Sequence, residues 1–191
     1  QNGERFGQDM KVTKETIVAA ARELFRQKGY AGASMQDLAN SVGLRKASLY
    51  TRFANKEALV PDVLDLTLRD TFACNGSKEG SWDAAYETDI RLIADGLLNS
   101  KRCVGLHLAY GVSDETPLAK EAVRAFFQSH LDRLSDILSR AMPRETAESV
   151  AADALVRLEG ATLLVAVFDE TQTMERAVHA ILTDAAKAAL Q

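Results

Sequence analysis

Hydrophobic residues recur along this chain at intervals of three and four, which is the spacing of one face of an α-helix. The first such stripe includes Ile17 and Phe25, and Thr13 stands before it as a helix cap. Gly29 comes after the stripe, at a position where a helix commonly ends with a positive φ. This pattern predicts a first helix over residues 13–28.

Two shorter amphipathic segments follow the first one. Ser34 is placed to cap a second helix, and Asp37 lies three residues further on, as in a capping box. Gly43 ends that helix and allows a tight turn. The next apolar residues, Leu49 and Phe53, lie on one face of a third short helix that we expect from about residue 45.

Six more helices can be read in the rest of the chain. Asn55 is expected to cap the fourth helix, in which Pro61 lacks a hydrogen-bond donor and predicts a kink or a loosened turn. The other five are expected at residues 82–99, 101–110, 117–141, 145–168 and 173–190. Strand-like alternation is missing from the pattern, so we predict an all-α fold of about nine helices.

Composition supports an ordinary globular protein and excludes a membrane span. Apolar residues make up 47% of the chain and charged residues 26%, and no run approaches the ~18 apolar residues that a spanning helix needs. The first ten residues lack the apolar core of a signal peptide, so we expect a cytoplasmic protein. Cys74 and Cys103 form no disulfide framework and are expected to be reduced thiols.

Charge is divided unevenly along the chain, and this division changes the functional picture. The net charge is −4, yet residues 1–56 hold ten Lys/Arg against five Asp/Glu, a balance of +5. The remaining residues hold thirteen against twenty-two, a balance of −9. A basic segment attached to an acidic one favours contact with a polyanion at one end only.

Residues 34–53 have the layout of a helix-turn-helix, in which the second helix enters the major groove of DNA. The segment from Leu49 to Leu59 continues it with the pattern Leu-Tyr-x-x-Phe-x-x-Lys-Glu-x-Leu. Together with the long first helix, this pattern resembles the TetR/AcrR family of regulators. Two departures, Arg45 in place of a small capping residue and Ala47 in place of a frequent glycine, prevent any transfer of an operator sequence.

The resemblance implies a division into three parts and a function. Residues 1–10 are expected to be a disordered arm, 11–56 a three-helix DNA-binding domain, and 57–191 a helical domain for ligand binding and dimerisation. The implied function is a homodimeric transcriptional repressor that a small molecule releases from a palindromic operator. A ligand-gated activator or a redox-sensing repressor on the same fold are the alternatives. The sequence offers no catalytic motif and no metal-ligand cluster, so neither an enzyme nor a cofactor is expected.

The DNA contacts are expected from exposed polar residues around the third helix. Long donors at its start can reach guanine or phosphate, and the resemblance implies phosphate contacts for Tyr50 and Lys56. The full expected set is Ser34, Gln36, Arg45, Lys46, Ala47, Ser48, Tyr50, Thr51, Arg52 and Lys56.

Two further sets of residues are expected in the second domain. Aromatic residues with a few polar groups are typical of a small-molecule pocket, and few charges among them favour an apolar or aromatic effector. These residues are Trp82, Tyr86, Cys103, His107, Tyr110, Phe126, Phe127, His130 and Phe168. Apolar stripes on the last two helices are expected to form the dimer interface, through Leu155, Leu158, Ala161, Thr162, Val165, Ala177, Val178, Ile181 and Leu182.

Overall fold

A computed structural model describes residues 12–73 and 80–190 of the chain. Within these residues the backbone forms nine α-helices, one 3₁₀ turn and no strand, which confirms the all-α prediction. The elements are α1 (Lys14–Gly32), α2 (Met35–Ser41), α3 (Lys46–Tyr50), η1 (Glu57–Leu59), α4 (Val60–Thr71), α5 (Trp82–Ser100), α6 (Val104–Ala109), α7 (Pro117–Leu138), α8 (Arg144–Phe168) and α9 (Gln172–Ala188). The expected arm at residues 1–10 and Cys74 lie outside the described residues.

The first three helices begin and turn where the sequence predicts. Thr13 caps α1, because its hydroxyl accepts from the backbone N–H of Thr16 at 3.2 Å. Gly29 has a φ of 66° and interrupts the regular helix, so that the last turn of α1 runs in a new direction. Ser34 caps α2 in the same way, and Gly43, with a φ of 67°, supplies the turn before α3.

Two boundaries differ from the expected ones. Pro61 lies in the first turn of α4, directly after η1, so its missing N–H breaks no bond inside the helix and the predicted mid-helix kink is replaced by a 3₁₀ turn. The sixth helix begins only at Val104. Lys101 adopts a left-handed conformation with a φ of 54° and ends α5, and Cys103 then caps α6.

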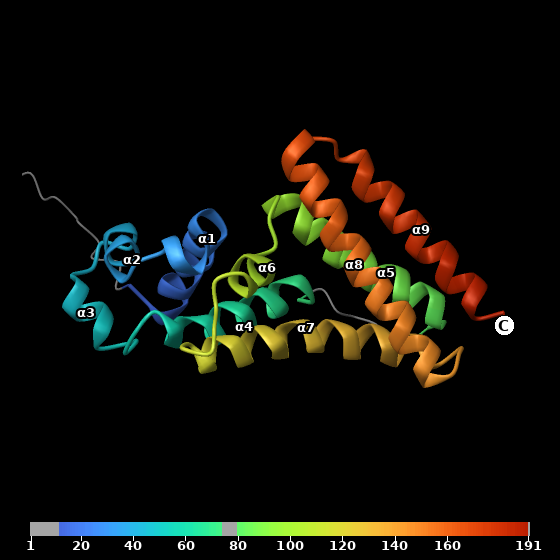
Figure 1. The fold of residues 1–191 in the computed structure, drawn as a ribbon, viewed down its shortest axis with the longest axis horizontal. Coiled ribbons are helices and arrows are strands. Elements are labelled where there is room, and N and C mark those ends of the chain that lie inside the picture. The colour runs from blue at the N-terminus through green and yellow to red at the C-terminus, as the bar shows by residue number, and fades with distance from the viewer. Residues whose placement is uncertain (1–11, 74–79, 191) are drawn as a thin grey trace, which may run out of the picture.

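Figure 1 shows α1, α2 and α3 together at one end of an elongated molecule. We call this part the head, residues 12–56. Helices α4 and α7 run side by side from the head towards the other end, where α5, α8 and α9 pack together. Helix α6 lies between α1 and α7. We call residues 57–190 the body; no helix in the described part of the chain is long and apolar enough to cross a membrane.

Side-chain hydrogen bonds fix η1 to the start of α7 within the body and join the body to the head. The carboxylate of Glu57 accepts hydrogen bonds from the backbone N–H groups of Leu118 (2.7 Å) and Ala119 (3.1 Å), where α7 begins. The guanidinium of Arg102 donates to the carbonyls of Arg26 (3.2 Å) and Gln27 (3.4 Å) on α1. The orientation of the head therefore depends on α1, α6 and α7 as well as on α4.

Candidate functional site

The outer face of α3 is the first candidate site. Leu49 and Phe53 are buried, and they fix which side of the helix packs on the head. The other side faces solvent, where the Lys46 ammonium lies 5.9 Å from the centre of the Tyr50 ring. Arg45 precedes the helix and makes no side-chain cap bond, so its guanidinium is not committed to the helix end.

Nine of the ten expected DNA-contact residues are exposed, and only Lys56 is half-buried. Four of the nine also hold local structure through side-chain hydrogen bonds. In these bonds Ser34 Oγ accepts from Asp37 N (3.0 Å), Gln36 Nε2 donates to Asn40 Oδ1 (2.9 Å), Thr51 Oγ1 donates to Ser48 O (2.8 Å) and Arg52 Nη1 donates to Val12 O (2.6 Å).

Lys56 has a structural position that the sequence did not indicate. Its ammonium donates to the carbonyls of Tyr30 (2.5 Å) and Ala33 (3.0 Å), and it lies 4.2 Å from the centre of the Tyr30 ring. Burial lowers the pKa of this ammonium. Lys56 therefore joins the end of α1 to the start of α2, and a phosphate contact from it stays a prediction.

A cavity of about 500 Å³ in the body is the second candidate site. Its lining comes from α1, α4, α5, α7 and α8, and from the residues that lead into α6. This volume lies within the usual range for small-molecule sites. Because α1 belongs to the head, the cavity is bounded by both parts of the molecule.

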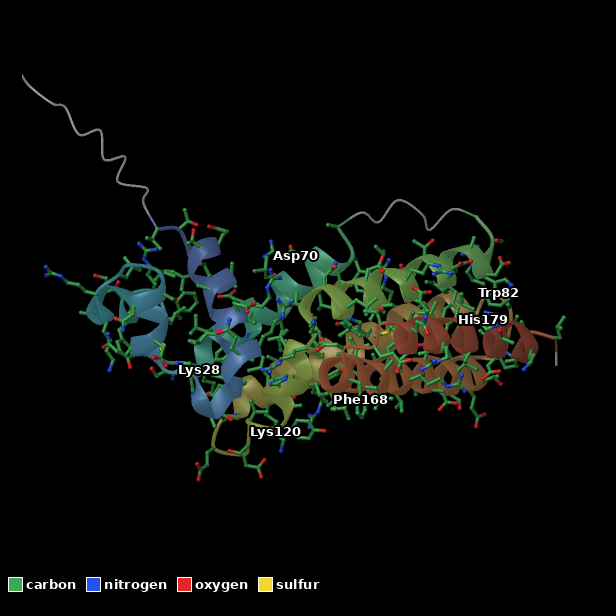
Figure 2. All side chains as sticks on the ribbon, turned by 90° about the horizontal axis from the view of Figure 1, so that it is seen from above. Lys28, Asp70, Trp82, Lys120, Phe168 and His179 are labelled. Atoms are coloured by element: carbon green, nitrogen blue, oxygen red, sulfur yellow. The ribbon has the colours of Figure 1, made fainter. Side chains whose placement is uncertain are left out.

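Four of the nine expected pocket residues line this cavity: Cys103, Phe126, Phe127 and His130. The other five do not. Tyr110 and Phe168 are 85% and 68% exposed, Tyr86 is buried in the core, and His107 and Trp82 lie elsewhere. Figure 2 shows Trp82 and Phe168 well separated from Asp70, which lies at the cavity. Helical spacing alone does not distinguish pocket aromatics from core or surface ones.

The expectation of few charges in the pocket was wrong, since seven lining residues are Arg, Asp or Glu. They are Arg22, Glu23, Arg26, Asp70, Asp95, Arg102 and Glu159. Glu159 carried a usable signal, because it is a charged residue beside the apolar stripe of α8 that includes Leu155 and Leu158.

Three of the residues that line the cavity, Cys103, His130 and Glu159, carry groups with shifted pKa values. Burial raises the pKa of the Glu159 carboxyl, which lies beside the Cys103 thiol. Burial and the neighbouring Glu159 together raise the pKa of that thiol. His130 stands close by with its Nδ1 3.0 Å from the Phe126 carbonyl, and burial lowers its pKa. These shifts favour neutral forms of all three groups in the absence of a bound partner.

The apolar stripes of α8 and α9 are divided between core and surface. Leu158, Ala161, Thr162, Val165, Val178 and Ile181 are buried within the subunit, and Leu155, Ala177 and Leu182 are half-buried. The six buried side chains pack in the subunit's own core, which corrects their assignment to a dimer interface. A different apolar row on α8 is exposed instead: Val156, Leu163, Leu164, Val167 and Phe168.

Known proteins resemble both the sequence and the shape of this chain. A sequence profile described as "Bacterial regulatory proteins, tetR family" matches residues 17–63, which cover most of the head and the start of α4. A regulator from Bacillus subtilis, described as the uncharacterized HTH-type transcriptional regulator YuxN, is 29% identical over 146 residues, which are 73% of this chain and 50% of that protein. The chain thus spans about half the length of this relative.

Two further matches extend the comparison. The biofilm operon negative transcriptional regulator IcaR of Staphylococcus epidermidis is 27% identical over 128 residues, 65% of this chain and 64% of that protein. A TetR transcriptional regulator from Legionella pneumophila superposes with a TM-score of 0.75 at 22% identity, over 95% of this chain and 97% of that one. The profile matches the segment that carries the helix-turn-helix, and the fold of the whole described chain matches as well. Residues 17–63 therefore carry the DNA-binding segment of the tetR family of bacterial regulatory proteins, and the described chain has the fold of TetR regulators.

Proposed function

We propose that the chain is a DNA-binding transcriptional regulator, and that it represses its target genes. The observation that carries this proposal is the exposed face of α3, where Lys46 and Tyr50 stand beside Arg45 at the end of a basic head. Long cationic and hydroxyl donors on an outward helix are the groups that contact phosphates and base edges in a major groove. The relative IcaR is described as a negative regulator, which favours repression over activation.

The regulator would act as a homodimer through α8. A single helix-turn-helix contacts little DNA, and two heads can read a palindrome whose half-sites lie one turn, ~34–36 Å, apart. The exposed row on α8 is suited to a second copy, since Val156 and Val167 are 71% and 61% exposed and Gly160 leaves open space between them. Large exposed apolar patches commonly mark such interfaces.

An effector in the cavity would release the repressor from its operator. A ligand changes DNA affinity only if it binds one arrangement of the heads better than another. A ligand in the cavity can distinguish such arrangements because α1 and α4 contribute to the lining. Redox sensing through Cys103 is less favoured, since the thiol is 7% exposed and its raised pKa opposes thiolate formation.

Selection of bound fragments from sheared genomic DNA tests the DNA-binding proposal. We expect a shared inverted repeat, and we expect Lys46→Ala and Tyr50→Ala to weaken its binding. Lys46→Ala should also lower the slope of log affinity against log salt by roughly 1, if the side chain neutralises one phosphate. Lys187→Ala, on the exposed end of α9, is the control that should bind like the wild type. Recovery of fragments without a common motif would contradict the proposal.

Sedimentation velocity tests the proposed dimer. Leu163→Glu places a charge in the middle of the exposed row on α8 and should convert the dimer into a folded monomer. The matched change Leu118→Glu, on an exposed residue of α7, should leave the dimer intact. A dimer that survives Leu163→Glu would place the interface on another face.

A further inference from the structure

Three consecutive residues, 101–103, lead from α5 to α6, and each has a different partner. We call them the connector. Lys101 Nζ pairs with Asp169 Oδ1 at the end of α8, at 2.7 Å, and both residues have a positive φ that side chains rarely adopt, 54° and 55°. Cys103 is buried and caps α6. The connector is thereby fixed to the body on both sides of Arg102, whose exposed side chain reaches the head.

The guanidinium of Arg102 binds the main chain of α1 at the point where that helix is interrupted. Gly29 breaks the regular geometry of α1, and the last carbonyls of a regular helical segment lack N–H partners within that segment. Arg102 Nη1 donates to two carbonyls just before the break, those of Arg26 (3.2 Å) and Gln27 (3.4 Å). A positive charge at this end also complements the helix dipole. Arg102 therefore acts as a cap for α1 that comes from a distant part of the chain.

Two side-chain ion pairs also join the head to the body, and both run to α4. Lys14 pairs with Asp62 at 2.8 Å, and Arg22 pairs with Asp70 at 2.6 Å. Lys14 and Asp70 are exposed, and exposed pairs of this kind restrain a structure only weakly. Because α4 follows the head directly along the chain, these pairs fix the head relative to one helix. Arg102 fixes it relative to α5, α6 and α8 as well.

The last turn of α1 transmits its position to the other helices of the head. Gly111, which follows α6, lies so close to this turn that a Cβ on it would be 2.7 Å from Tyr30 Cβ. Lys56 donates to the carbonyls of Tyr30 and Ala33 and joins this turn to the start of α2. Helix α2 packs in turn on α3. A change in the position of α1 relative to the connector therefore changes the direction of α3.

We propose that Arg102 is a positioning residue for DNA binding, which fixes the direction in which the head presents α3 and does not touch DNA itself. The consequence for DNA rests on the proposed function. Two half-sites are engaged together only when both heads have the matching orientation. A head that samples a wider range occupies that orientation for a smaller fraction of the time, and the apparent affinity falls by the same fraction. Arg102 and Cys103 also line the cavity, so an occupant of the cavity contacts the connector.

Residual dipolar couplings of backbone N–H groups, measured on the full chain without DNA, test the positioning directly. In the wild type, the couplings of residues 12–56 and 80–190 should fit one alignment tensor with the same degree of order. In Arg102→Ala, the degree of order of the head should be roughly a quarter lower than that of the body, because the head samples several orientations.

Arg140→Ala is the matched control. Arg140 is also an exposed arginine that donates to a main-chain carbonyl, but its acceptor, Gly80, lies in the body as well. Loss of that bond should leave the head and the body with one tensor and the wild-type order. Both variants should unfold at the temperature of the wild type, since each changes one surface side chain, and this separates reorientation of the head from melting.

The operator recovered from genomic DNA provides the second measurement. Arg102→Ala should weaken its binding about five- to tenfold and leave the slope of log affinity against log salt unchanged, because no phosphate contact is lost. The variant should also discriminate about threefold less against an operator with one base pair inserted at its centre, since less rigid heads tolerate a wrong spacing. Arg140→Ala should match the wild type in all three properties.

Equal order of the head and the body in Arg102→Ala would overturn the assignment. A salt slope lowered by about 1 would also overturn it, because Arg102 would then be a phosphate contact. An operator bound equally well by Arg102→Ala and the wild type contradicts this inference and leaves the proposed function standing. If the genomic selection yields no operator, the proposed function fails, and the dipolar couplings still decide whether Arg102 orients the head.

Discussion

The head and the cavity place their charged side chains in opposite environments. In the head, Arg45 precedes α3 and Lys46 begins it; both stand in solvent, and neither forms an ion pair within residues 12–73 and 80–190. In the body, Asp89 is buried and Glu159, at the cavity, is shielded from solvent, and the free energies of both carboxyl groups depend on their surroundings in the folded chain. Exposed charges are available for a polyanion at little cost to stability, while buried charges must be paired within the protein or by a ligand.

The largest effect on stability is expected at the buried ion pair between α5 and α7. Asp89 receives two hydrogen bonds from Arg133, at 2.6 and 3.0 Å, and the Arg133 guanidinium lies 4.1 Å from the Phe72 ring. Asp89→Ala leaves that guanidinium without its partner and should lower the free energy of unfolding by about 3 kcal/mol. Chemical denaturation followed by circular dichroism measures the loss.

The control for this variant is Asp70→Ala, which removes the exposed partner of Arg22. Asp70 is 53% exposed in this pair, so the change should cost less than about 1 kcal/mol. Similar losses in the free energy of unfolding for the two variants would mean that burial does not determine how much each ion pair contributes to stability.

Lys56 differs from the exposed cations of the head because it is half-buried. The second largest loss of stability is expected when its side chain is removed. Lys56→Ala leaves the carbonyls of Tyr30 and Ala33 without their charged donor and should cost about 2 kcal/mol of stability. Lys46→Ala, in the exposed α3, should change stability by less than about 0.5 kcal/mol. Thermal unfolding compares the two; an unaltered midpoint for Lys56→Ala would show that its bonds to the backbone contribute little.

A smaller effect is expected from the cap of α2. Ser34→Ala removes the acceptor for the Asp37 N–H and should cost about 1 kcal/mol. Ser129→Ala is the matched change, since Ser129 is exposed within α7 and only donates to the Ala125 carbonyl. That variant should stay within about 0.5 kcal/mol of the wild type in urea unfolding. A cap variant as stable as its control would indicate that water replaces the serine hydroxyl.

The same contrast explains how much of the molecule could be predicted from sequence. Caps, glycine turns and the exposed face of α3 depend on neighbours within a few residues, so Thr13, Ser34, Gly29 and Gly43 were predicted correctly. The number of helices followed from their apolar stripes in the same way.

The cavity could be predicted only in part, because five segments far apart in sequence form it. Phe126 and Cys103 were expected there, and Arg26 was not, since an arginine on a helix surface has the same local pattern whether it meets solvent or another helix. Core positions on α8 were assigned to a dimer interface for a related reason. Apolar spacing identifies two faces of a long helix, and only the packing of α9 shows which face stays exposed.

The smallest effect is also the one that most directly tests the buried carboxylate of the cavity. Glu159 has a pKa raised above its ordinary value of 4.5 by burial. The folded protein therefore holds this proton more tightly than the unfolded chain does, and stability from this group is lost as pH rises from about 4.5 through the folded pKa. In the ligand-free protein, Glu159→Gln should be more stable than the wild type at pH 7, by roughly 0.5 to 1 kcal/mol.

The sign of this change shows whether burial or internal hydrogen bonding dominates the free energy of the Glu159 carboxylate. The gain from Glu159→Gln should vanish near pH 4, where the wild-type carboxyl is protonated as well. Glu145→Gln, at an exposed position of the same helix, should show no such pH-dependent gain. A loss of stability in Glu159→Gln at neutral pH would mean that the interactions of the carboxylate in the folded chain, including that with the Cys103 thiol, outweigh the cost of its burial.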